Sequence, residues 1–183
     1  LAWDENAKAA ASNDDFDVDV AVAALGADGK LLSDAWFVYY GVAIGADGLK
    51  HSPNSAIRLR KDNLTGDADG DDEYCYIDFN KLPADAQKVK VVVAIYLAIT
   101  HNQNFGMINK ASVRIGDAST ANSAGQMPVG TGIVNYDLTE DYSIHNAIEV
   151  CEFYKNGEEW KMTPIGTGQK FQNGLSDFMK QWH

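Results

Sequence analysis

Two short acidic segments constrain this chain most, because each crowds carboxylates together without a single Lys or Arg. Residues 14–19 read DDFDVD and residues 62–73 read DNLTGDADGDDE, so the two segments hold ten of the 26 acidic residues. Carboxylates this dense repel one another on a folded surface unless positive charge lies among them. Apolar strand-like runs flank both segments, and glycines interrupt the second, which favours an ordered structure. We therefore expect a bound divalent cation with oxygen ligands.

Strand-forming runs dominate the rest of the chain and define the expected fold class. Runs rich in Val, Ile, Tyr, Phe and Trp predict strands at residues 18–25, 35–40, 56–60, 74–79, 89–99, 111–115, 132–138, 147–154 and 159–165. Turn signals separate them, with Asn156-Gly157 as the clearest hairpin. Many short strands at this spacing predict a mainly β protein, an antiparallel β-sandwich of two sheets in a single domain, residues 1–183.

Helical signals are few. The apolar residues that share one helical face near the C-terminus are Leu175, Phe178, Met179 and Trp182. Their spacing predicts a short C-terminal helix. We expect a helical turn at residues 83–87 and a mobile, Gly-rich loop at residues 116–132. The acidic stretch 136–141 should end a strand in a turn, with Thr139 or Asp141 as the capping residue.

Charge and cysteine content exclude several classes of partner. The net charge is −11 and the pI is near 4.6, so the chain lacks the basic face that nucleic acid requires. An anionic membrane is also disfavoured unless a bound cation inverts the local charge. No apolar run is long enough to span a bilayer, and no signal peptide is recognisable. Because Cys75 and Cys151 lie in apolar strand-like runs, we expect reduced thiols and a cytoplasmic location, with membrane association as the alternative.

Strand geometry decides which acids of the first segment can converge. Alternate residues of a strand point to one side, so Asp15, Asp17 and Asp19 should project together. The second segment adds carboxylates at Asp67, Asp69, Asp71, Asp72 and Glu73. Gly66 lets the backbone of this segment turn tightly. The two segments together could supply the roughly six to eight oxygen ligands of calcium, enough for one or two ions, whereas magnesium requires a stricter octahedron.

Several motifs occur in the order found in a known family. They are Leu1-Ala2-Trp3-Asp4, DFDVD at 15–19, DNLTGDADGDDE at 62–73, QNFG at 103–106 and YDLTED at 136–141. In this order, and over nearly the whole chain, the sequence resembles the TerD family of tellurium-resistance and stress-response proteins. The resemblance implies a calcium-binding sandwich of two antiparallel sheets, associated with resistance to tellurite and other chemical stresses.

The resemblance also implies a ligand set and two departures from it. The family's calcium motif maps onto Asp17, Asp19, Asp62, Asn63, Gly66 (through its carbonyl oxygen), Asp69, Asp71, Asp72 and Glu73, with Asp15 and Asp67 as further candidates. Leu97 and Ile99 stand where many relatives carry acids, which removes any ligand from that strand. Relatives usually carry an additional N-terminal strand before the Trp-Asp pair. We therefore expect an exposed sheet edge, which invites pairing with another chain or needs cover.

The expected function is binding and not catalysis. We expect a calcium-binding protein, with other stress-response proteins or, through bound calcium, a membrane surface as further partners. One rival is a calcium-dependent membrane or adhesion module, and a weaker one is a metal-dependent hydrolase. The sequence has no GxSxG, HExxH, Walker or dinucleotide-binding glycine motif. An EF-hand is excluded because Asp72 stands where that loop requires Gly and because the flanking segments are strands.

Overall fold

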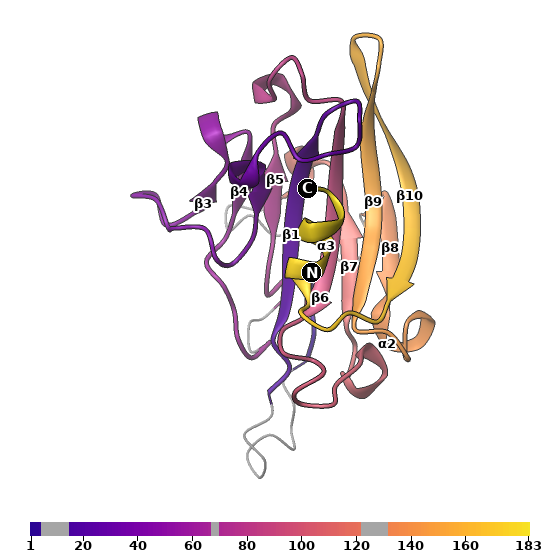
Figure 1. Ribbon diagram of the computed structural model, residues 1–183. Helices are drawn as coiled ribbons and strands as arrows, with labels where there is room; N and C mark the ends of the chain where they lie inside the picture. The colour runs from indigo at the N-terminus through magenta and orange to yellow at the C-terminus, as the bar shows by residue number, and fades with distance from the viewer. Residues whose placement is uncertain (5–14, 67–69, 122–131) are drawn as a thin grey trace.

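The structure is a computed structural model that describes residues 1–4, 15–66, 70–121 and 132–183 (Figure 1). Its strands are β1 (Val18–Leu25), β2 (Phe37–Val38), β3 (Lys50–His51), β4 (Ile57–Leu59), β5 (Cys75–Ile77), β6 (Lys88–Ile95), β7 (Ser112–Ile115), β8 (Val134–Asp137), β9 (Ala147–Asn156) and β10 (Glu159–Gln169). Its helices are α2 (Leu138–Asp141) and α3 (Leu175–Gln181), with 3-10 turns η1 (Asp34–Trp36), η2 (Pro53–Ser55), η3 (Phe79–Lys81), η4 (Phe105–Met107) and η5 (Ala118–Thr120).

The strands of the described residues form three antiparallel sheets, which confirms the predicted mainly β class. The largest has the order β10-β9-β6-β1-β2, and the smaller ones are β3-β4-β5 and β7-β8. One face of the large sheet packs on β4, β5 and β7 around a shared core. The second layer of the sandwich is therefore divided between two sheets, where the sequence predicted one.

β1 lies at the centre of this arrangement and is buried on both faces. It pairs with β6 over its whole length, from Val18↔Ile95 to Leu25↔Lys88. Its even-numbered side chains enter the core between the layers. Its odd-numbered Ala21, Ala23 and Leu25 pack beneath α3. This double burial explains why all eight residues of β1 are shielded from solvent.

α3 confirms the predicted C-terminal helix and covers the outer face of the large sheet (Figure 1). Leu175, Phe178 and Trp182 face the sheet, with the Phe178 and Trp182 rings stacked at a centroid distance of 5.7 Å. This contact buries the apolar face that the sequence spacing predicts. No helix among the described residues has the length and apolar character needed to cross a membrane.

Several local predictions differ from the structure. The strand predicted at 89–99 ends at Ile95, because residues 96–102 form turns. The segment 83–87 is a turn and not a helix, with the Ala86 N–H donating to the Pro83 carbonyl at 3.0 Å. The predicted loop at 116–132 contains η5, and its residues 122–131 lie outside the described residues. Both cysteines are free thiols, as expected.

The turn at the end of β8 has a different cap from the one predicted. The Asp137 carboxylate, and not Thr139 or Asp141, accepts the Glu140 N–H at 3.0 Å and so caps α2. The Thr139 hydroxyl instead donates to the Ile108 carbonyl at 2.9 Å and accepts the Ala111 N–H at 2.9 Å. Asp137 precedes the helical turn directly, which is the position that the N-cap requires.

The first residues lie between the two small sheets. Leu1 exchanges backbone hydrogen bonds with Glu73, and Ala2 exchanges them with Ser112. Within the described residues β5 pairs with β4 alone and β7 pairs with β8 alone, so each has one edge without a neighbouring strand. The bridge from Ala2 to Ser112 covers part of this edge of β7, so the exposed sheet edge expected from the sequence stays a prediction.

Candidate metal centre

Three carboxylates converge at the start of β1. Among the described residues, Asp17, Asp19 and Asp62 each place one oxygen within 4.8 Å of the others (a group that could hold an ion). Asp17 and Asp19 share one side because strand residues two apart point the same way. Asp62 arrives from the second acidic segment, where the Arg60 N–H to Tyr74 carbonyl bond at 3.1 Å extends the β4–β5 pairing. The two segments therefore meet, as the sequence predicts.

Glu73 adds a fourth carboxylate to this group. Its side chain is buried, and its Oε2 accepts the Val20 N–H at 2.9 Å. That N–H is available because β2 pairs only with Val22 and Ala23, which leaves the edge of β1 open at Val20. The Asp62 carboxylate lies close to those of both Asp19 and Glu73. Glu73 thus closes the open edge of β1 and borders the three aspartates. We call Asp17, Asp19, Asp62 and Glu73 the acidic cluster.

Burial makes this crowding costly. Asp19 is only 2% exposed, and one oxygen each of Asp17, Asp19 and Asp62 is buried without a hydrogen-bond partner. None of the ion pairs among the described residues joins a Lys or Arg to Asp17, Asp19 or Asp62. A buried carboxylate oxygen loses its hydration, and without a hydrogen-bond partner nothing compensates this free-energy cost. These carboxylates could therefore hold a cation, which would supply the counter-charge that the described residues do not.

The electrostatic cost appears as raised pKa values. Burial, followed by the nearby charge of Asp62, raises the pKa of Asp17 to about 7. Burial and then the charge of Glu73 raise the pKa of Asp19 well above its usual value. Burial also raises the pKa of Glu73, against the hydrogen bond from Val20. Tyr40 lies near these carboxylates, and its burial, followed by the charge of Asp19, raises its pKa to about 12. Burial and mutual repulsion therefore favour the protonated forms of these carboxyl groups relative to exposed ones.

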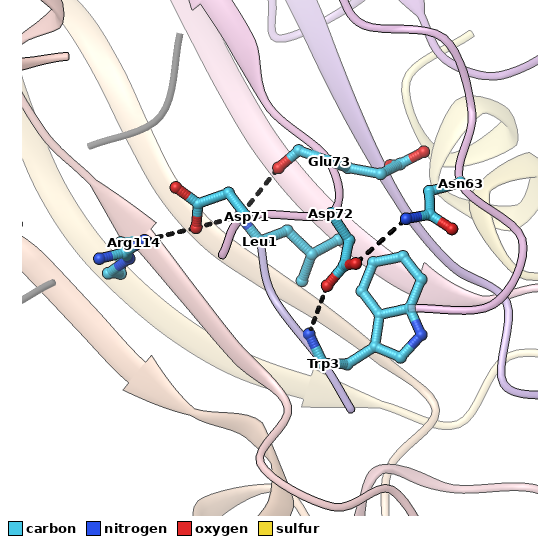
Figure 2. Close-up of polar contacts among 7 residues, drawn as sticks. All are labelled: Leu1, Trp3, Asn63, Asp71, Asp72, Glu73 and Arg114. Atoms are coloured by element: carbon cyan, nitrogen blue, oxygen red, sulfur yellow. Dashed lines mark hydrogen bonds and ion pairs between the residues drawn. The ribbon is translucent and has the colours of Figure 1, made fainter. Parts of the chain in front are cut away.

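Asp72 and Asn63 brace the second acidic segment from within (Figure 2). The two Asp72 oxygens accept the Trp3 N–H at 2.9 Å and the Asn63 side-chain amide at 3.0 Å. The Asn63 side-chain oxygen accepts the N–H groups of Thr65 at 3.1 Å and Gly66 at 3.3 Å. These bonds hold the loop after Asp62 in a fixed shape. The side-chain atoms of Asp72 and Asn63 that could bind an ion are used in these bonds. Direct binding of an ion by either residue stays a prediction.

Asp71 points to a different partner. Its carboxylate pairs with the Arg114 guanidinium of β7 at 2.5 Å, and Figure 2 shows the Asp71 and Glu73 carboxylates directed to opposite sides of the segment. The structure does not group Asp71 with the acidic cluster. Asp15 is not in the group of three either, and its carbonyl oxygen accepts the Gln103 side-chain amide at 3.2 Å. Asp67 and Asp69 lie outside the described residues.

Trp3 connects the two acidic segments, a role that sequence reasoning missed. Its indole Nε1 donates to the Phe16 carbonyl at 2.9 Å, and its backbone N–H binds Asp72. The indole also packs against Gly66, where a Cβ would lie 2.4 Å from Nε1. Gly66 has φ of +70°, which favours glycine as well. The Trp-Asp pair noted in the sequence was the available signal, but it carried no indication of these contacts.

A cavity among the described residues borders the acidic cluster through Glu73. Its volume is about 500 Å³, and its walls include the apolar side chains of Val91, Val113 and Phe153. Glu73 and Asp71 reach its rim, but Asp17, Asp19 and Asp62 do not line it. Of the four carboxylates of the cluster, Glu73 is therefore the one that borders this cavity.

Comparisons with known proteins agree with the motifs. A model of the TerD domain matches residues 1–182. The chain is 36% identical over 182 residues to the uncharacterised protein YceE of Bacillus subtilis, covering 100% of this chain and 84% of that protein. It is 36% identical to general stress protein 16U of the same organism, covering 96% of this chain and 81% of the relative. The tellurium resistance protein TerD of an Alcaligenes species is 33% identical, with coverage of 100% and 84%.

A solved structure shares the fold. The crystal structure of a homologue of telluride resistance protein (TerD) from Streptomyces coelicolor A3(2) superposes with a TM-score of 0.71. That match covers 93% of this chain and 87% of the other, at 17% sequence identity. The similarity therefore supports the architecture of the sheets, and the sequence comparisons above support the family.

Proposed function

The chain belongs to the TerD family, and on that premise we propose that it is a calcium-binding protein of the chemical-stress response, including resistance to tellurium compounds. Curated relatives carry the names of tellurium-resistance and general stress proteins. One observation carries the calcium proposal: Asp17, Asp19 and Asp62 each place one carboxylate oxygen within 4.8 Å of the others, and each has a buried oxygen without a hydrogen-bond partner. An ion between them would supply the missing partner to each.

The donor set favours calcium over other ions. The acidic cluster offers carboxylate oxygens only, which suit hard cations, whereas zinc and copper sites use His or Cys ligands. Asp17, Asp19 and Asp62 are the residues that would hold the ion, with Glu73 beside them. Calcium tolerates irregular oxygen shells and several ligands from one loop, whereas magnesium retains water and requires an octahedron. Calcium thus fits two segments that approach from different sheets.

Calcium would act as a structural counter-charge. The cluster joins β1, which lies between β6 and β2 in the large sheet, to the segment before β5 in the other layer. An ion bound only by the native state stabilises it by mass action, by about 2.7 kcal/mol when its concentration is 100 times the dissociation constant. The level of free calcium would then set the stability of the contact between the two layers.

The test is calcium titration by calorimetry combined with a thermal melt in calcium or in chelator. We expect one or two sites and a higher melting temperature in calcium. The matched pair of variants is Asp62→Asn, inside the cluster, and Asp34→Asn, an exposed aspartate on η1. Asp62→Asn should lose most of the calcium-dependent shift, and Asp34→Asn should keep it. No binding heat together with identical melts would refute the proposal.

A further inference from the structure

Large apolar side chains are exposed on the turn that follows β6. Tyr96, Leu97 and Ile99 are 41%, 44% and 48% exposed, although Ala98 between them is buried. The turn adjoins the acidic cluster, because the Tyr96 N–H donates to the Asp17 carbonyl oxygen at 2.8 Å. The Tyr96 ring also contacts the Tyr40 ring at 5.4 Å between centroids. Apolar tips and buried carboxylates thus meet at one place.

The exposed apolar residues extend along the neighbouring loops. The N–H groups of Phe105 and Gly106 in η4 donate to the carbonyls of His145 and Ser143, at 2.9 and 3.2 Å. These bonds bring the exposed Met107 and Ile144 to this end. Leu64 lies in the loop between Asp62 and Gly66 and is exposed as well. Six of the nine exposed large apolar side chains of the described residues therefore belong to the segments around the cluster: Leu64, Tyr96, Leu97, Ile99, Met107 and Ile144. Figure 1 shows the loop after β6, η4 and α2 at the same lower end of the sandwich as the start of β1.

Leu97 has a backbone conformation that its side chain does not favour. Its φ is +48°, in the left-handed region. Hydrogen bonds hold the turn in this shape, from the His101 N–H to the Leu97 carbonyl at 3.1 Å and from the Gln103 N–H to the Ala98 carbonyl at 2.7 Å. A branched apolar residue at such a position is strained, and an exposed one gains little packing within the chain in return. An exposed leucine in this conformation is therefore better explained by a contact with another molecule than by packing within the chain.

We propose that this surface, the turn of Tyr96, Leu97 and Ile99 with its apolar neighbours, docks the protein on an anionic lipid bilayer when calcium occupies the acidic cluster. The inference rests on the proposed calcium binding. Without the ion, the cluster and the net charge of −11 repel anionic head groups. With the ion bound, phosphate or carboxylate oxygens of the head groups can complete its coordination shell.

The shape and composition of the surface favour a bilayer over a protein groove. The apolar side chains stand on turns, which project and can enter the head-group region singly. Tyr suits the membrane interface because its ring is apolar and its hydroxyl is polar. Leucine and isoleucine supply the burial of apolar area that holds a protein at the interface. In this proposal bound calcium attracts the anionic head groups, and the apolar side chains of the turn insert between them.

The experiment is vesicle co-sedimentation of the full chain. Vesicles of equimolar phosphatidylcholine and phosphatidylserine, or of phosphatidylcholine alone, are mixed with protein in calcium or in chelator. We expect binding only to the phosphatidylserine vesicles and only in calcium. Leu97→Gly and Ile99→Ser should each weaken it by about tenfold, as expected for one lost apolar anchor. Ile44→Ser is the matched control, because Ile44 is 49% exposed but belongs to the bridge beside β3, and it should bind like the wild type.

The outcomes separate this inference from the calcium proposal. Leu97→Gly relieves the left-handed strain and should not lower the melting temperature, so its loss of binding would not reflect unfolding. Calcium heat in calorimetry without vesicle binding would overturn the docking surface and leave calcium binding intact. The docking surface would also be overturned by vesicle binding that persists in chelator, by binding that does not depend on phosphatidylserine, or by equal effects of Leu97→Gly and Ile44→Ser. If the surface binds a protein instead of a bilayer, calorimetry would show calcium heat and the vesicles would not bind.

Discussion

The Glu73 side chain accepts the Val20 N–H at 2.9 Å, so the second acidic segment is fixed to the open edge of β1. This bond places the Glu73 carboxylate beside Asp19 and joins the two layers of the sandwich at one polar point. The same point collects buried carboxylates from two segments that are more than 40 residues apart in sequence.

Replacing Asp19 by Asn should stabilise the protein in chelator and remove most of the stabilisation by calcium. The amide has the same shape but no charge, so it relieves repulsion from Glu73, Asp17 and Asp62 in the empty cluster. Differential scanning calorimetry in chelator and in calcium measures both effects. An unchanged calcium shift in Asp19→Asn would count against ligation at this residue.

The stability of the calcium-free protein should decrease as pH rises from about 5 to about 8, since the pKa of Asp17 is about 7. Carboxylates with raised pKa values bind more protons in the folded state than in the unfolded state over this range. The free energy of unfolding therefore falls as pH rises, which is the reverse of the usual trend for paired carboxylates. Urea denaturation in chelator across this range checks the sign. In saturating calcium the slope should vanish or reverse, because the ion replaces the protons.

Replacing Gly66 by Ala should destabilise the fold by more than the same change at Gly48. Both glycines have positive φ, +70° and +81°, so both substitutions carry a backbone cost of about 1–2 kcal/mol. Only at Gly66 would the new Cβ collide with the Trp3 indole, because nothing lies within 4 Å at Gly48. Urea denaturation of the two variants isolates the steric part. Equal losses would mean that the Trp3 contact is not tight.

Replacing Arg114 by Met should destabilise the protein by about 3–5 kcal/mol, the range for removing one partner of a buried pair. The change leaves Asp71 buried beside β7 without the guanidinium that it pairs with. Because Asp71 is not grouped with the acidic cluster, the heat of calcium binding should persist in the folded variant. Denaturation gives the first quantity and calorimetry the second. Loss of the calcium heat in the folded variant would show that the Asp71–Arg114 pair is coupled to the acidic cluster.

The parts of the fold that depend on local pattern could be read from the sequence. β1 runs from Val18 to Leu25 as predicted, because its apolar run is bounded by acids on one side and by Gly26 on the other. The strand at 89–99 was predicted too long, since Leu97 and Ile99 continue an apolar run but stand exposed on a turn. The sequence alone does not distinguish an apolar residue exposed on a turn from one that continues a buried strand.

The candidate site was predictable in composition and less so in geometry. Asp17 and Asp19 converge because strand alternation requires it, and Asp62 joins them as the resemblance implied. The direction of Asp71 depends on Arg114, which is 43 residues away and gives no local signal. The contacts of Trp3 depend on the approach of two loops, which only the folded chain defines.

β1 is packed on both faces, and this has a consequence for ion selectivity. Asp19 stands on β1 and Asp17 directly precedes it, and β1 cannot shift inward or outward without disturbing the helix on one side or the second layer on the other. A bound ion would therefore have to match a spacing that is set before it arrives. We expect the rigid wall to discriminate by radius, admitting the larger alkaline-earth ions and leaving the smaller magnesium ion with water in place of a shortened bond.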